Sequence, residues 1–259
     1  MKKEHTKIRP HGQMSDSFAT AAFLSLSGGL QDSYTYLLRG RVFANAQTGN
    51  LVLLSQCIIQ RQWNRVLHYL IPIFFFAFGV AAAELIRERF QKTVKIHWRQ
   101  LVLADEIFLL FLVGCLPGKF NLLANAMVSF SCAMQVQAFR KVNGYAFAST
   151  MCIGNMRSGM ESLCAYRETH HLSELCKAVR YCGIILLFAL GAGAGSCLLS
   201  VFGLHTIWIS CFLLLISLCL MFMRDEVSDH PEIRQEEKAI ISDLKDIRNE
   251  IHDIEQQMK

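Results

Sequence analysis

The sequence has little charge for its length. Only 18% of its 259 residues are Asp, Glu, Lys or Arg, whereas 53% are hydrophobic, and a soluble domain carries about 25% charge. This deficit excludes an ordinary soluble enzyme, and the excess of apolar residues excludes a disordered chain. Long apolar runs fill residues 18–223, while 1–11 and 224–259 are polar. The profile predicts a membrane core with two soluble ends.

The sequence also lacks the motifs of metal and catalytic sites. Its ten cysteines form no CxxC pair, although zinc sites and disulfide frameworks need clustered spacing. Most of them lie in apolar runs, where a free cysteine behaves as a small hydrophobe. No HExxH or GxSxG motif occurs. We therefore expect no metal, no cofactor and no enzyme activity. The net charge of +5 is explained by basic residues beside the membrane, so no nucleic acid partner is expected.

Six apolar runs approach the length of about 20 residues that a helix needs to cross a bilayer. They are residues 18–38, 66–86, 101–116, 121–139, 179–201 and 204–223. The third run is short, and we place Asp105 and Glu106, near its start, at the membrane interface rather than at depth. Two further stretches, 43–59 and 147–165, are each interrupted by a Gly-Asn pair. We predict helix breaks at Gly49 and Gly154 and two segments that re-enter the membrane without crossing it.

Charge decides between six and eight crossings. The segment 87–99 has five Lys or Arg residues against one Glu, so the positive-inside rule places it in the cytoplasm. Six crossings satisfy that rule and put both termini in the cytoplasm, whereas eight put the segment outside. The predicted protein is a multi-pass inner-membrane protein. Four arginines contradict this topology, because six crossings leave them outside: Arg39, Arg41, Arg61 and Arg65.

The second half of the sequence repeats features of the first half. Gln31 matches Gln135 at an offset of 104, and Gly49-Asn50 matches Gly154-Asn155 at 105. Phe76 and Gly79 match Phe188 and Gly191 at 112. Each half would own three spans and one interrupted segment, and an odd number of spans gives the halves opposite orientations. Inverted repeats with broken helices are a recurring transporter architecture.

The expected fold class is therefore an all-α membrane protein with six transmembrane helices in two inverted three-helix repeats. Each repeat contains a broken or re-entrant segment. The predicted divisions are a cytoplasmic N-terminal segment at 1–16, repeat 1 at 17–116, repeat 2 at 117–223 and a cytoplasmic helix at 224–259.

Residues 28–54 read GGLQDSYTYLLRGRVFANAQTGNLVLL. The GG-x-x-D-x-Y-x-Y run, the G-x-V-F-A step and the A-Q-T-G-N block resemble the signature of the YoaK-type family of bacterial membrane proteins, which carry a domain of unknown function. The hydropathy of residues 15–223 is similar to that family as well. The resemblance implies a polytopic inner-membrane protein and carries no activity. The tail after Met223 is longer than the family leads us to expect.

Polar residues near the interruptions are the candidates for a solute pathway. Asp32 lies inside the first run, where an ionisable group is a functional candidate by default; the alternative is an ion pair with Arg39 or Arg41. The neutral candidates could orient a small polar solute or join helices by hydrogen bonds. The predicted pathway consists of Gln31, Asp32, Gln47, Thr48, Asn50, Gln135 and Asn155.

The C-terminal tail has apolar residues spaced alternately four and three positions apart from Ile240 to Met258. This spacing is typical of a coiled coil, so we predict self-association of the chain through residues 240–258. Two functions stay open at this point. One is a small-solute permease that works by alternating access, with the lipid bilayer and an unknown solute as partners. The other is a scaffold or sensor that acts through its cytoplasmic helix.

Overall fold

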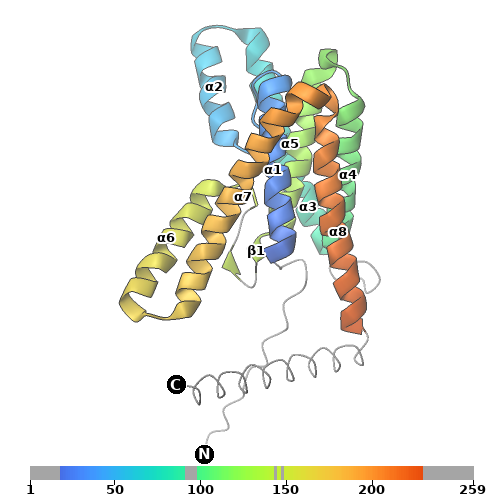
Figure 1. The fold of residues 1–259 in the computed structure, drawn as a ribbon. Helices are drawn as coiled ribbons and strands as arrows, with labels where there is room; N and C mark the ends of the chain where they lie inside the picture. Colours follow the sequence, from blue (N-terminus) through green and yellow to red (C-terminus); the bar gives the residue numbers. More distant parts are fainter. Residues whose placement is uncertain (1–17, 91–97, 143–144, 147–148, 230–259) are drawn as a thin grey trace, which may run out of the picture.

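The computed structural model describes residues 18–90, 98–142, 145–146 and 149–229. Within these ranges the chain forms eight α-helices (Figure 1). They are α1 (Phe18–Leu38), α2 (Gln47–Ile59), α3 (Trp63–Phe90), α4 (Trp98–Cys115), α5 (Asn121–Ala138), α6 (Cys152–Thr169), α7 (Leu172–Phe202) and α8 (Ile207–Asp229). The expected all-α class is confirmed. The segment 1–16 and the predicted coiled coil at 240–258 lie outside the described residues.

Short elements join the helices. A 3-10 turn at Gly118–Phe120 precedes α5, and another at Gly203–Thr206 connects α7 to α8. The strands β1 (Lys141–Val142) and β2 (Tyr145–Ala146) pair antiparallel between α5 and α6. Each of the six predicted apolar runs falls on one of the helices α1, α3, α4, α5, α7 and α8; the last run starts on the 3-10 turn before α8.

The predicted helix breaks at Gly49 and Gly154 are wrong in position. Both glycines are the third residue of a helix, α2 or α6, and the interruptions come earlier, at 39–46 and 139–151. The first interruption begins where Gly40 and Arg41 adopt positive φ angles of 94° and 66°, which no α-helix can continue through. The Gly-Asn pair that interrupts each apolar stretch therefore lies in the first turn of a helix and does not break that helix.

The helices divide into two bundles by their contacts. The first bundle contains α2, α3, α4 and α5, in which α3 packs against α5, α4 against α5 and α2 against α3. The second bundle contains α1, α6, α7 and α8, in which α7 packs against α1, α8 against α1 and α6 against α7. The contact between α4 and α8 joins the bundles. These main contacts are unchanged when α1, α2, α3 and α4 are exchanged with α5, α6, α7 and α8; a smaller contact between α3 and α4 has no such counterpart.

The main helix crossings of the two bundles use equivalent small residues. A Cβ atom placed on Gly79 of α3 would collide with the Phe130 carbonyl oxygen of α5, and one on Gly191 of α7 would collide with the Leu26 carbonyl oxygen of α1. Leu26 and Phe130 are 104 positions apart and the two glycines 112 apart, as in the sequence repeat. Small residues let backbones approach closely where lipid removes the usual hydrophobic drive for helix association.

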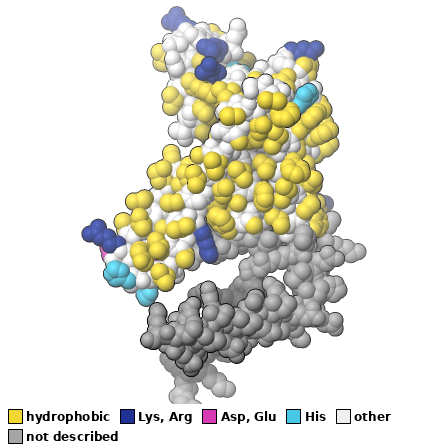
Figure 2. Space-filling view, viewed as in Figure 1, with side chains coloured by type: hydrophobic (Ala, Val, Ile, Leu, Met, Phe, Trp, Pro, Cys, Tyr) yellow, Lys and Arg dark blue, Asp and Glu magenta, His cyan; other side chains and the backbone are white. Residues whose placement is uncertain are grey.

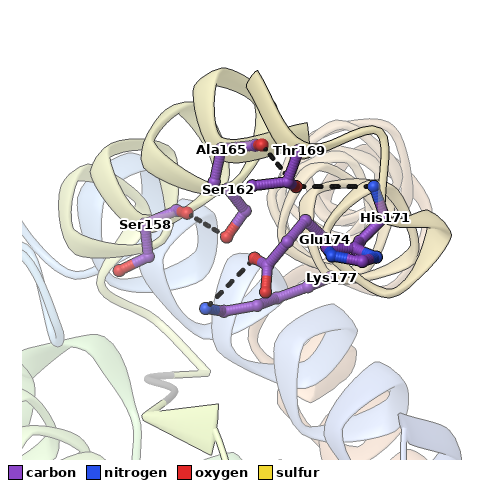
Figure 3. Close-up of polar contacts among 7 residues, drawn as sticks. All are labelled: Ser158, Ser162, Ala165, Thr169, His171, Glu174 and Lys177. Atoms are coloured by element: carbon purple, nitrogen blue, oxygen red, sulfur yellow. Dashed lines mark hydrogen bonds and ion pairs between the residues drawn. The ribbon is translucent and has the colours of Figure 1, made fainter. Parts of the chain in front are cut away.

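The two hairpins formed with α2 and α6 lie at opposite ends of the molecule. Figure 1 shows the α2–α3 connection at the upper end and the α6–α7 connection at the lower end. The lower connection is held locally (Figure 3): the Thr169 hydroxyl donates to the Ala165 carbonyl at 2.8 Å and accepts the His171 N–H at 3.4 Å. Glu174 and Lys177 pair at 3.7 Å on the next turn.

Arg39 explains part of the charge conflict in the predicted topology. Its side chain is completely buried, and its guanidinium donates to the carbonyls of Val113 and Leu116 at 2.8 and 2.9 Å, at the end of α4. It also donates to the Tyr34 hydroxyl at 2.7 Å. Carbonyls at a helix C-terminus carry partial negative charge. Arg39 is therefore bound inside the protein, and its charge does not report which side of a membrane it faces.

Apolar side chains cover much of the molecular surface. Figure 2 shows them over the long flank of the molecule, with Lys and Arg gathered toward its ends. The exposed apolar residues include Phe74, Phe78, Phe108, Phe111, Leu186 and Phe212. Soluble monomers rarely expose contiguous apolar patches of this extent.

We predict that Gly191→Ala destabilises the fold by about 1–3 kcal/mol, because the new methyl group must push α7 away from α1. Thermal unfolding of the purified chain in detergent measures the effect. Gly193→Ala in the same helix is the matched control, since its Cβ would meet no atom within 4 Å. Equal midpoints for the two variants would contradict the close crossing.

Candidate functional site

The segment between α1 and α2 is held in place by two amide side chains. Asn50 accepts the Phe43 N–H at 3.0 Å and donates to the Phe43 carbonyl at 2.7 Å. Gln47 donates to the Ala44 carbonyl at 2.7 Å and accepts a hydrogen bond from Asn50 at 2.9 Å. Asn50 is fully buried, so these bonds satisfy backbone groups that water cannot reach.

Asp32 reaches the same segment from α1. One of its carboxylate oxygens accepts the Asn45 N–H at 2.8 Å, and the side chain is only 7% exposed. Within the part of the chain that the structure describes, Asp32 forms no ion pair. The alternative in which it pairs with Arg39 or Arg41 is therefore wrong: Arg39 is bound to α4, and the Arg41 guanidinium lies 5.5 Å from the Tyr36 ring.

A cavity of about 730 Å³ lies between the two bundles, where α2 and α6 begin. From the second bundle it is lined by residues of α1, α6 and α7, among them Asp32, Cys152 and Phe188. The segment before α2 contributes Phe43 and Asn45, and the first bundle itself contributes Gln47, Thr48 and Phe76. Phe76 and Phe188 are partners in the sequence repeat, so the two halves contribute equivalent aromatic walls. The volume is within the range of small-molecule sites.

The structure separates the seven predicted pathway residues into two groups. Asp32, Gln47 and Thr48 line the cavity. Gln31, Asn50, Gln135 and Asn155 are buried and do not belong to its lining. For Asn50 the bonds to Phe43 explain the burial.

Gln31 and Gln135 meet at a carboxyl group that sequence analysis had assigned to the membrane interface. Glu106 of α4 is completely buried among the helices, and its depth relative to a membrane stays a prediction. The Gln31 amide donates to one Glu106 oxygen at 3.1 Å. The Gln135 amide oxygen accepts a hydrogen bond from the Ser149 hydroxyl at 2.7 Å. The Gln135 amide nitrogen donates to the two Glu106 oxygens at 2.8 and 3.1 Å. The Cys132 thiol donates to the Gln31 oxygen at 2.6 Å.

This cluster of Gln31, Glu106, Cys132 and Gln135, the Glu106 cluster, joins the two bundles. Gln31 belongs to the second bundle and the other three residues to the first. The two glutamines are repeat partners, so the cluster lies where equivalent positions of the two halves converge. In the structure Glu106 lies on one helix face with Leu103 and Leu110, and both leucines are buried; the sequence gives no signal for this, because Asp105 has apolar neighbours at the same spacing. The neighbouring Asp105 faces outward and is exposed.

The electrostatics of the cavity are dominated by Asp32. It is the one charged side chain among the described residues that line the cavity. A cation about 4 Å from a carboxylate gains roughly 4 kcal/mol at an effective dielectric constant of about 20. The N-termini of α2 and α6 oppose this by about 0.3–2 kcal/mol each. In α2 two of the first N–H groups, of Gln47 and Gly49, bond loop carbonyls at 2.9 and 3.0 Å. The carboxylate therefore outweighs the helix ends.

No group of three His, Cys, Asp or Glu side chains that could hold a metal ion occurs among the described residues. The arrangement thus offers a mostly apolar chamber with one carboxylate and several hydroxyl and amide groups. Its volume and lining suit the binding of a small molecule.

Comparison with known proteins agrees with this architecture. The family described as "Protein of unknown function (DUF1275)" matches residues 20–220. The chain belongs to this family. It is similar to the UPF0700 transmembrane protein YoaK of Bacillus subtilis (strain 168), with 30% identity over 152 residues, 55% of this chain and 65% of that protein. The match thus spans less than two thirds of that relative's length. No solved structure matches the chain.

Family membership and helix composition together identify a membrane protein. The resemblance to the YoaK-type family is confirmed. Two stretches of the described residues are long and apolar enough to cross a membrane: Trp63–Phe90, and Leu172–Phe222, which joins α7 to α8. The exposed apolar flank of Figure 2 has the same explanation, because lipid is its natural solvent.

We predict that Glu106→Ala destabilises the protein strongly. It removes the acceptor of the buried Gln135 amide and one of the two acceptors of the Gln31 amide, which also donates to the Ser27 hydroxyl at 2.9 Å, and each unsatisfied buried donor costs about 1–3 kcal/mol. Glu106→Gln retains an oxygen and should lose less than half as much. Thermal unfolding in detergent measures both variants, with Asp105→Ala as the control, expected to stay within about 0.5 kcal/mol of the wild type. If Glu106→Ala were as mild as this control, the Glu106 cluster would not hold the bundles together.

Proposed function

We propose that the protein is a small-solute permease that works by alternating access. It is an inner-membrane protein with six crossing helices, α1, α3, α4, α5, α7 and α8, and both termini in the cytoplasm. The two halves are inverted repeats, and the cavity between the bundles is the solute site. No catalytic step or cofactor is part of this proposal.

The observation that carries the proposal is the position of the cavity. Its walls come from both bundles, so a rocking movement of one bundle against the other would open it alternately to each side. Interrupted helices whose N-termini meet near the midplane are the usual place of substrate sites in transporters built from inverted repeats. Non-helical backbone is tolerated at such depth only where it is buried in protein or lines a wet cavity.

The equivalence of the two halves supports the same proposal. The main contact pattern survives the exchange of the halves, the tight crossings use repeat-related glycines, and α2 and α6 each carry Gly-Asn as their third and fourth residues. The hairpins with α2 and α6 lie at opposite ends of the molecule (Figure 1), as an inverted pair requires. A rocking mechanism needs two conformations of similar energy, and pseudo-symmetry supplies them, because each half can adopt the conformation of the other.

Cys152 provides a test that does not require knowledge of the solute. It lines the cavity near Asp32 and is only partly buried. In a variant that retains Cys152 alone, we expect a membrane-impermeant maleimide to label it from either face of sealed vesicles, because alternating access exposes the cavity to each side in turn.

A variant that retains Cys132 alone is the control and should stay unlabelled from both faces, since that thiol is 1% exposed and lies outside the cavity lining. Labelling of Cys152 from one face only, at any reaction time, would indicate a fixed vestibule and favour a scaffold or sensor. In that case deletion of residues 230–259 should abolish the biological activity. The permease predicts that this deletion leaves Cys152 labelling unchanged.

A further inference from the structure

We propose that the cavity binds an organic ammonium cation with an apolar body, such as an arylalkylamine. This inference rests on the proposed permease and names the chemical class of its solute. It follows from two features of the cavity wall: a single carboxylate without an ion-pair partner, and a lining that is otherwise neutral and mostly apolar.

The carboxylate sets the sign of the ligand charge. Asp32 is the single charged side chain in the described lining, and no cation of the described chain neutralises it. Its hydrogen-bond partners are neutral groups of Ala44 and Asn45, among them the Asn45 N–H at 2.8 Å, so its negative charge is hydrogen-bonded but not cancelled. A ligand cation would complete the pair, and an anion would be repelled.

The carboxylate also favours a cation that brings N–H groups. Its oxygens accept a hydrogen bond from the Asn45 N–H at 2.8 Å, and a carboxylate has room for further donors. An ammonium group carries several N–H donors, and hydrogen bonds between two charged groups are about twice as strong as those between neutral groups.

The rest of the wall sets the body of the ligand. Phe43, Phe76 and Phe188 contribute aromatic rings, and Leu37 and Ile153 contribute aliphatic surface. The lining also has hydroxyl and amide groups, among them Gln47 and Thr48, but most of it is apolar. An organic cation can bury apolar surface against such a wall, which an inorganic cation cannot do, and aromatic faces attract it. The lining therefore favours an amine over Na⁺ or K⁺.

The test compares ligands of nearly equal size that differ in charge or in N–H groups. Binding of 2-phenylethylammonium, 3-phenylpropanoate, 2-phenylethanol and the N,N,N-trimethyl derivative of the amine is measured by calorimetry on the full chain in detergent. We expect the ammonium to bind at least about tenfold more tightly than the carboxylate and the alcohol. The trimethyl derivative should bind several-fold more weakly than the ammonium, because it has no N–H to donate to the Asp32 carboxylate.

Variants locate the binding. Asp32→Asn should weaken ammonium binding about tenfold or more and leave the alcohol unchanged. Asp105→Asn, which removes an exposed carboxylate outside the cavity lining, should change neither. Tighter binding of the carboxylate, ammonium binding that is insensitive to Asp32→Asn, or no binding of any probe would overturn the inference. The ligand series on the wild type decides the sign of the charge even if Asp32→Asn fails to fold.

The outcomes also separate this inference from the permease proposal. Asp32-dependent binding of the amine without its uptake into vesicles would retain the site and contradict the permease. Labelling of Cys152 from both faces without amine binding would retain alternating access and overturn the solute class.

Discussion

A peptide group without a hydrogen-bond partner is expensive wherever water is absent, and this protein has a non-helical segment, 39–46, inside its helical core. The structure satisfies that segment with side chains instead of helix bonds. Asn50 pairs with both backbone groups of Phe43, Gln47 with the Ala44 carbonyl, and Asp32 with the Asn45 N–H. These bonds hold the chain between α1 and α2 in its non-helical path. The cavity exists because the chain ahead of α2 is held in an irregular path beside it.

Polar groups in the core have two separate roles. Asn50 and the Glu106 cluster hydrogen-bond to protein partners, and they fix the loop and the two bundles respectively. Asp32 has no ion-pair partner and the Asn45 side-chain oxygen has no donor in the described chain, and both residues belong to the cavity wall. This division matters for the interpretation of variants. Loss of activity in an Asn50 or Glu106 variant reflects the fold, whereas a change of ligand preference in an Asp32 variant reflects the site.

The close crossings and the Glu106 cluster impose different constraints on movement. Gly79 and Gly191 bring helices into backbone contact within each bundle, so each bundle is expected to move as a unit. Between the bundles the contacts include the α4–α8 and α1–α5 packing, the bonds of Arg39 to the end of α4 and the hydrogen bonds of the cluster, and such hydrogen bonds can be exchanged at lower cost than interlocked backbones. The Glu106 carboxyl group is held by one glutamine from each half. When the bundles move, it can keep its hydrogen bond to one glutamine while its bond to the other lengthens.

Much of the fold follows from hydropathy and spacing. The helices α1, α3, α4, α5, α7 and α8 coincide with apolar runs, because the bilayer requires about 20 apolar residues per crossing. The repeat at Gly79 and Gly191 is visible in the sequence, and the structure gives both glycines the same contact. The positions of the interruptions were missed, since positive φ angles at Gly40 and Arg41 decide the first of them and hydropathy does not register backbone angles.

The sequence alone therefore determines that this is a helical membrane protein with matching halves. It does not determine which residues of each helix face inward, because lipid-facing side chains are as apolar as the core and the usual hydrophobic periodicity is lost. For that reason the sequence does not show that Glu106 is buried and Asp105 is exposed. It also does not show that Asn50 binds the loop whereas Thr48 lines the cavity. Only tertiary packing, which brings α1, α4 and α5 together around one carboxyl group, decided those roles.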